Sequence, residues 1–426
     1  MRRLLAFLLV TALVVTGAVW LADRPGEVMI RWQGWRLDTS VPVLLAALVV
    51  LMVLLSLVGR LIRLVFGAPG RFFDSRRIKR TRKGYVALSD GLAAVAAGNS
   101  RQAARLAKKA DKLLGDSSVT GLLTIQAAQM IGDADELRVS YQSMTERAET
   151  AYLGFKGLSD LALKQGDRET ARDNAVRAFA LQPGADGLAA TLFDLQMEAG
   201  QLAEAELTLS SARRHSSLSG DQLDRRRALV LFARAEAAEQ SGDSNHALTL
   251  ALESRDRDPG FIPAVVLAAS LYGRKGKERK AESLLQSAFA IVPHPDLTRQ
   301  WAALGATDSP LDRVKRMQRL VEINSQSPDG HFALAEAALA AKLWGQARTH
   351  LERAYDQRPT LKVLTLLARL ERDEKKDEAA ALAWLAKAGD VKPEPAWICG
   401  SCDGKSATYS VCCPACGVPG RQEWMQ

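Results

Sequence analysis

Two long apolar runs stand near the start of the chain. Leu4 to Ala22 and Val41 to Gly59 each contain 19 residues without a charged side chain. A helix of that length spans roughly 28 Å, close to the thickness of a bilayer core. We therefore expect two transmembrane helices, at 4–22 and 41–59, inside a membrane anchor formed by residues 1–66.

The first run has a second interpretation. Arg2 and Arg3 precede it, as basic residues precede the apolar part of a cleaved signal peptide. The run is longer than that apolar part usually is, which favours a membrane span. Ser40 and Pro42 at the start of the second run are typical of a helix N-terminus, so they predict where the second span begins.

Charge predicts the orientation of this anchor. Residues 60–83 hold nine basic residues against one acid, whereas residues 23–40, between the two runs, carry three of each sign. The positive-inside rule then places both chain termini in the cytoplasm and residues 23–40 outside, as a short periplasmic loop. The basic juxtamembrane segment 67–83 should also contact anionic membrane lipids.

The loop between the spans has alternating apolar positions at Val28, Ile30 and Trp32. This alternation permits a short strand or hairpin against the outer leaflet. Trp20, Trp32 and Trp35 are residues that favour the headgroup region. We expect an ordinary interfacial loop here.

After the anchor, glycines recur every 34 residues. They are Gly98, Gly132, Gly166 and Gly200, with Gly242 and Gly276 resuming the interval after one longer step. Thirty-four residues is the length of a helix–turn–helix tetratricopeptide (TPR) unit, and alanines recur where the two helices of such a unit touch. The chain is therefore predicted to be all-α, with a TPR solenoid over residues 84–393.

Each glycine should end a helix with a positive φ, and several are followed by an Asp or Asn that can cap the next helix. The last repeats are degenerate, since Lys342 and Lys376 replace the glycine. Residues 211–226 add about eight residues to one repeat, where we expect a longer connection. Residues 302–312 contain a Gly/Ser/Pro cluster that predicts an irregular hairpin.

The formal net charge of +9 does not indicate nucleic-acid binding. Nine basic residues of the 60–83 segment and the two arginines at 2 and 3 account for it, so the repeats are nearly neutral. The basic character belongs to the anchor, and we expect no nucleic-acid partner.

All five cysteines lie within residues 399–416. Two C-x-x-C pairs, Cys399 with Cys402 and Cys413 with Cys416, are separated by ten residues. Four thiolates in this arrangement suit tetrahedral zinc, so residues 394–426 are predicted to form a four-cysteine zinc knuckle with a structural ion.

Several features of the knuckle stay open. A redox-active iron site of the rubredoxin kind is the alternative to zinc. Cys412 is the spare cysteine, and a site that uses it in place of Cys416 is also compatible with the sequence. Disulfides are disfavoured in a cytoplasmic segment. Trp397, Tyr409 and Trp424 should pack around the knuckle, which would cap the last repeat or add a second contact with a partner.

The sequence contains no nucleotide-binding glycine fingerprint, no G-x-S-x-G and no H-E-x-x-H. Its histidines are scattered over different repeats and are expected to be solvated side chains: His215, His246, His294, His331 and His350. We therefore expect no catalytic site and no cofactor besides the metal, and predict a scaffold and not an enzyme.

Taken together, the two spans, the loop from Pro25 to Ser40 with its motif IRWQGW, the basic stretch RFFDSRRIKRTRKGYVALSDGLAAVAAGN and the TPR units resemble the HemY family of bacterial inner-membrane proteins. The cysteine tail is similar to the metal-binding tail of the alphaproteobacterial members. It is also similar to the rubredoxin-like tail of LapB-type proteins, which have one span where this chain has two.

The resemblance implies a bacterial inner-membrane protein that organises the enzymes or porphyrin intermediates of late haem biosynthesis. No porphyrin site can be identified from these residues. A flavin-dependent protoporphyrinogen oxidase is also called HemY. That enzyme needs a dinucleotide-binding unit near its start, where this chain has apolar helices. The alternative function is a LapB-like adaptor for regulated proteolysis or envelope lipid synthesis.

Overall fold

The computed structural model describes residues 2–23, 26–32, 34–115, 118–391 and 393–425. It forms two compact units, Met1–Asp133 and Ala134–Gln426, which are described separately. Both are almost entirely helical, which confirms the all-α prediction.

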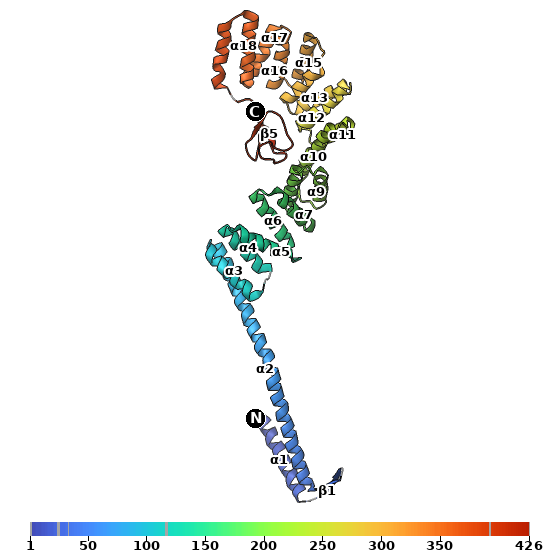
Figure 1. Ribbon diagram of the computed structural model, residues 1–426, viewed down its shortest axis with the longest axis vertical. Helices are drawn as coiled ribbons and strands as arrows, with labels where there is room; N and C mark the ends of the chain where they lie inside the picture. Colours follow the sequence, from blue (N-terminus) through green and yellow to red (C-terminus); the bar gives the residue numbers. More distant parts are fainter. Residues whose placement is uncertain (1, 24–25, 33, 116–117, 392, 426) are drawn as a thin grey trace. The chain divides into compact units, whose positions relative to one another are not determined.

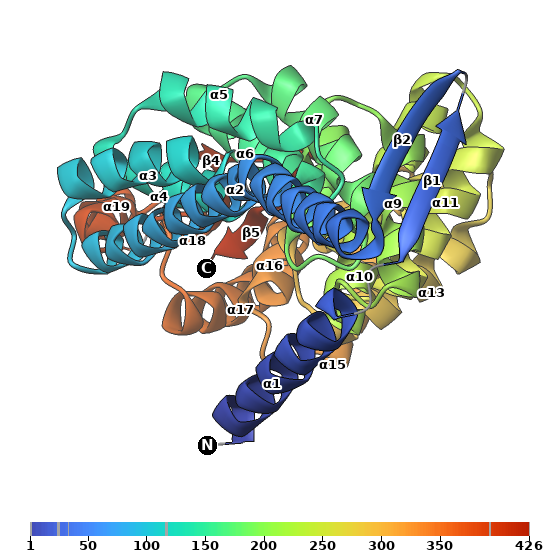
Figure 2. The same ribbon diagram turned by 90° about the horizontal axis from the view of Figure 1, so that it is seen from below.

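The first unit begins with helix α1 (Arg2–Ala22) and a two-stranded antiparallel sheet. The strands β1 (Glu27–Trp32) and β2 (Trp35–Ser40) lie side by side (Figure 2). The expectation of an ordinary interfacial loop was therefore wrong, and the alternative, a short hairpin, is what the structure has. The alternating residues form a strand because Gly34, with φ +88°, supplies the left-handed turn conformation that a tight hairpin requires.

Helix α2 (Val41–Ala96) is 56 residues long and continues from the apolar run into the first repeat. The predicted boundaries after residues 66 and 83 fall inside it, so they mark changes of composition and not ends of secondary structure. Among the described residues, the stretch Val41–Ile62 of α2 is long and apolar enough to cross a membrane. Helices α3 (Ser100–Leu114) and α4 (Ser118–Ile131) complete the unit.

The second unit is a row of helices in which α6/α7, α8/α9, α10/α11, α12/α13, α14/α15, α16/α17 and α18/α19 are hairpins (Figure 1). The bounds of the earlier helices are α5 Ala134–Thr145, α6 Ala151–Gln165, α7 Arg168–Leu181, α8 Leu188–Glu198, α9 Leu202–Arg214, α10 Gly220–Gln240, α11 Ser244–Arg257 and α12 Ile262–Arg274. The later ones are α13 Glu278–Ile291, α14 Pro295–Leu304, α15 Pro310–Ile323, α16 Pro328–Ala340, α17 Trp344–Gln357, α18 Leu361–Lys375 and α19 Glu378–Ala386, followed by a 3-10 turn at Lys387–Asp390.

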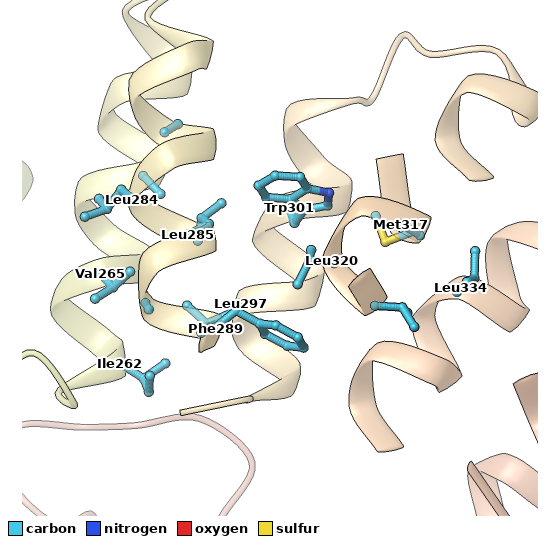
Figure 3. Close-up of a cluster of buried hydrophobic side chains, with 14 of the residues drawn as sticks. Ile262, Val265, Leu284, Leu285, Phe289, Leu297, Trp301, Met317, Leu320 and Leu334 are labelled. Atoms are coloured by element: carbon cyan, nitrogen blue, oxygen red, sulfur yellow. The ribbon is translucent and has the colours of Figure 1, made fainter. Parts of the chain in front are cut away.

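The hairpins stack through three clusters of buried apolar residues, and the largest cluster runs from α10 to α18. Small residues at the predicted positions, such as Ala247 and Ala281, are fully buried and let helices approach closely. Larger side chains fill the space between successive hairpins (Figure 3). Trp301 is the largest fully buried side chain among the described residues, and its indole Nε1 donates a hydrogen bond to the carbonyl oxygen of Arg316 at 3.0 Å.

The turns confirm the predicted period. The six predicted glycines all have positive φ, between +67° for Gly276 and +86° for Gly242. Lys342 and Lys376 adopt the same left-handed conformation, both at φ +58°, although a side chain there is strained. The degenerate repeats therefore keep the turn geometry of the regular ones.

The two irregular intervals have different outcomes. The extra residues at 211–226 extend a helix, since α10 has 21 residues, so the expected long connection was wrong. Ser219 starts α10 with a capping box that it forms with Gln222. At 302–312 the irregular hairpin is confirmed: α14 has 10 residues, and α15 begins after the turn at 305–309.

Candidate metal centre and repeat groove

The last residues, 393–425, form a small module that we call the C-terminal module. It contains strands β3 (Ala396–Cys399), β4 (Lys405–Ser406) and β5 (Gln422–Met425) in the order β4-β3-β5. Both pairs of neighbouring strands are antiparallel. Two turns that carry the cysteine pairs project from this sheet.

The structure brings the four predicted cysteines together. The Sγ atoms of Cys399, Cys402, Cys413 and Cys416 all lie within 4.8 Å of one another. Two of these separations, Cys399 to Cys416 and Cys402 to Cys413, are 3.7 Å. Four thiolates at about 2.3 Å from a tetrahedral ion are roughly 3.8 Å apart. The cluster therefore fits one metal ion of the zinc or iron type, whose identity the thiolates alone do not select.

The two cysteine turns have the same backbone geometry. Cys399 donates its N–H to the carbonyl oxygen of Gly404 at 3.0 Å, and Asp403 donates to that of Cys399 at 2.8 Å. In the second turn, Cys413 donates to the carbonyl oxygen of Val418 at 3.0 Å, and Gly417 donates to that of Cys413 at 2.8 Å. Each turn thus holds its two sulfur atoms on one side of the backbone, which pre-forms half of the site.

Cys412 does not join the cluster. Its Sγ lies 3.9 Å from the carbonyl oxygen of Met197 in α8, and burial raises the pKa of its thiol. The geometry therefore favours Cys416 over Cys412 as the fourth thiolate. Cys399 is fully buried, and the backbone N–H of Ser401 lowers the pKa of its thiol to about 7.

The C-terminal module packs against the middle repeats. Tyr409 lies edge-on to three rings, with centroids 5.9 Å from Phe232, 5.3 Å from Phe261 and 5.0 Å from Trp397. Figure 1 shows β5 inside the arc of helices α10 to α18. Of the two expected roles, capping of the last repeat is wrong, because Phe232 belongs to α10 and Phe261 to the turn before α12; a second contact with a partner stays a prediction.

His294 is a residue of this interface that the sequence did not single out. It is fully buried, and its ring lies 5.3 Å from that of Trp397 and 4.3 Å from that of Trp424. Its Nδ1 accepts a hydrogen bond from the backbone N–H of Asp296 at 3.0 Å. Burial lowers the pKa of His294 to about 4.

Two further histidines contact each other, one of them buried and the other half-buried. His331 is buried, and its Nδ1 lies 3.0 Å from Nδ1 of His350 in the next helix. Since Nε2 of His331 lies 3.0 Å from the carbonyl oxygen of Ser325, it is the donor there, and His350 then donates to His331. The expectation of solvated histidines was therefore wrong for His294 and His331, which are buried, whereas His350 is half-buried. His294 and His331 lie at helix starts, and the contact between His331 and His350 lies within the α16/α17 hairpin; the spacing in the sequence indicated neither feature.

A groove remains open beside the C-terminal module. Helices α14, α16 and α18 line a cavity of about 1070 Å³, and a second cavity of about 400 Å³ adjoins it at the module. The two share Pro295, Arg299, Phe332, Lys362 and Glu394 in their walls. This groove is large enough to hold a segment of another chain. Among its described wall residues, no nucleophilic side chain is paired with a basic one as in a catalytic site.

The comparisons with known proteins agree with the resemblance seen in the sequence. The family described as HemY protein N-terminus matches residues 26–132. The whole chain is similar to a probable magnetosome protein, Mms48, of Magnetospirillum gryphiswaldense. The two are 28% identical over 427 residues, covering 99% of this chain and 93% of the relative.

Solved TPR structures are also similar. A TPR protein from Parabacteroides merdae is 17% identical and covers 56% of this chain and 93% of its own, with a TM-score of 0.29. The structure of MamA is 14% identical over 37% of this chain and 92% of its own, with a TM-score of 0.27. The TPR architecture of this chain stands on its own repeat geometry.

Proposed function

We propose that the chain is a non-enzymatic TPR scaffold that is anchored in the bacterial inner membrane and binds partner proteins in the groove between α14, α16 and α18. The open cavity of about 1070 Å³ on one face of stacked hairpins carries the proposal. TPR stacks bind other chains along such faces. Tethering to a membrane raises the local concentration of a bound partner.

The anchor is proposed to cross the membrane twice, at 4–22 and 41–59, with both termini in the cytoplasm. Exposed apolar side chains along Val41–Ile62 and the exposed basic residues Arg77, Lys79 and Arg80 on the same helix support it. Because α2 runs without a break into the first repeat, the anchor would hold that repeat at a fixed distance from the membrane surface.

The C-terminal module is proposed to bind one structural zinc ion through Cys399, Cys402, Cys413 and Cys416. A module of this size has little apolar core of its own, and a metal would supply the folding free energy that the core lacks. Iron is the alternative, and the metal content of the purified protein decides between them.

The partners are proposed to be enzymes of late haem biosynthesis, as the resemblance to HemY implies. A second candidate, assembly of proteins on a specialised membrane, is favoured by the full-length similarity to a probable magnetosome protein. Both candidates use the same groove and anchor, so they differ only in the partner.

Crosslinking in intact cells, followed by identification of the joined proteins, tests the proposal. Haem-pathway enzymes should be enriched over a control with the groove blocked by Ala340→Trp, a substitution at an exposed residue of the cavity wall. Enrichment of proteases or lipid-synthesis enzymes would favour a LapB-like adaptor. Recovery of the chain in the soluble fraction would contradict the anchor.

A further inference from the structure

We propose that the groove between α14, α16 and α18 takes an extended, acidic segment of its partner, with apolar residues between the acidic ones. This rests on the proposed function, because it specifies the chemistry of the partner that the scaffold binds. Four observations lead to it. The C-terminal module fills the rest of the concave face, and the walls of the groove are basic. A carboxylate of the chain is already bound in the groove, and small side chains form its floor.

The C-terminal module fills the neighbouring part of the concave face. It lies against α8 through the pair Arg421–Asp194, at 3.9 Å, and against α10, where a Cβ on Gly420 would come within 2.5 Å of the Leu229 side chain. A partner therefore cannot lie along α8 and α10 while the module is docked. The open groove starts where the module ends, and Ala396 and Trp424 form its end wall.

The walls of the groove are basic. Among the described residues, six basic side chains line the two cavities, against three acidic ones. The basic residues are Arg299, Arg313, Arg358, Lys362, Arg369 and Lys405, and the acidic ones are Asp329, Glu336 and Glu394. Asp329 pairs with Arg358 and Glu394 pairs with Lys362, which leaves Glu336 as the remaining acid of these described walls. The net positive charge of the remaining wall residues attracts an anionic segment.

Arg299 and Arg369 are available to such a segment. Their side chains are 71% and 62% exposed, although each contacts an acid on its own helix. Exposed pairs of that kind contribute little and exchange readily for a partner's carboxylate.

The chain itself shows how the groove binds a carboxylate. Glu394 lies in the extended segment that leads into the C-terminal module, and its Oε1 accepts a hydrogen bond from the backbone N–H of Lys362 at 2.9 Å. Lys362 is in the first turn of α18. The N-terminal residues Pro295 of α14 and Pro328 of α16 line the same cavity. Three helix N-termini therefore add partial positive charge where the groove meets the module.

The floor of the groove fits an extended backbone with apolar side chains. Alanines from α14 and α16 line it, and small side chains allow a bound chain to approach the helices closely. They are Ala302, Ala303, Ala333, Ala337 and Ala340. Phe332, Met317 and Leu366 lie beside them and provide an apolar surface for larger side chains of the partner.

Selection of displayed random peptides on the full chain, purified in detergent, tests this inference. The enriched peptides should be acidic with interspersed apolar residues, and their affinity, measured by fluorescence anisotropy, should fall as salt is added. The double variant Arg299→Gln, Arg369→Gln should bind these peptides about ten-fold more weakly, because removing each charge should reduce the affinity roughly two- to five-fold. Arg279→Gln is the matched control, since Arg279 is exposed on α13 and lines neither cavity.

Enrichment of neutral or basic peptides would overturn the inference and leave the scaffold intact. The inference is also overturned if the double variant binds the acidic peptides as tightly as Arg279→Gln does, provided that both variants melt at the temperature of the unsubstituted chain. If no peptide is enriched and the crosslinking in cells also recovers no partner, the proposed function falls together with the inference.

Discussion

Tyr409 should hold the C-terminal module against the repeats. Its ring makes edge-on contacts with three aromatic rings, and each such pair contributes about 0.5–1.5 kcal/mol beyond the area that it buries. Truncating a packed aromatic side chain to alanine costs about 3–5 kcal/mol. Taking the lower end, because Tyr409 is partly exposed, Tyr409→Ala should weaken docking by about 3 kcal/mol.

The thiol of Cys412 reports docking. It is half-buried beside Met197 when the module is docked, and it becomes accessible when the module leaves. A loss of about 3 kcal/mol raises the undocked population on the order of 100-fold. Labelling of Cys412 by a maleimide, located by mass spectrometry in metal-loaded protein, should accelerate by that factor.

Two controls make this assay specific. Tyr409→Phe keeps the three ring contacts and should label at nearly the unsubstituted rate. Tyr272→Ala removes an aromatic side chain of α12 that is packed in the core and not against the module. If Tyr409→Ala labels within about two-fold of the unsubstituted chain, the aromatic contacts do not hold the module, and the reasoning is refuted.

Four further substitutions test the cluster, the turns and the buried histidine. Cys416→Ser should abolish stoichiometric metal binding in elemental analysis, whereas Cys412→Ser should retain it; equal loss in both would contradict the assignment of the fourth thiolate. Lys342→Gly should raise the free energy of unfolding by up to about 1 kcal/mol, because glycine relieves the left-handed strain at φ +58°, and a lower melting temperature would count against that explanation. The pKa of His294 is about 4 in the folded chain, below its usual value of 6.5, so the unfolded state takes up the proton first. Its stabilising contribution is then fully present above about pH 6.5 and is lost as the pH falls towards 4, so that melting temperatures should fall less over this range for His294→Asn than for the unsubstituted chain.

Local rules predicted most of the solenoid from the sequence. A turn that ends one helix and starts another needs a left-handed residue, and glycine supplies it at low cost, so the 34-residue interval located the hairpins. The turns at Lys342 and Lys376 could be found only because the period continued through them. The insertion at 211–226 was misplaced, because the helix-forming run after Ser219 extends α10 and spacing alone does not distinguish a longer helix from a longer loop.

The cysteine cluster was predictable and its location was not. Two C-x-x-C pairs separated by ten residues specify one site by short-range geometry alone. The contact between Cys412 and Met197 joins residues that are 215 positions apart in the sequence. A periodic sequence pattern does not predict a contact between residues so far apart. His294 was missed for the same reason, since its burial depends on two tryptophans that lie beyond the repeats.

Photocrosslinking from inside the groove tests the central claim most directly. A photoreactive amino acid at Thr365, which is exposed and lines the groove on α18, is compared in living cells with one at Arg279 on α13. A scaffold that binds its partner in this groove should give a discrete protein adduct from Thr365, found in the membrane fraction, and no matching adduct from Arg279. The same adduct from both positions, or adducts from Arg279 alone, would contradict binding in the groove.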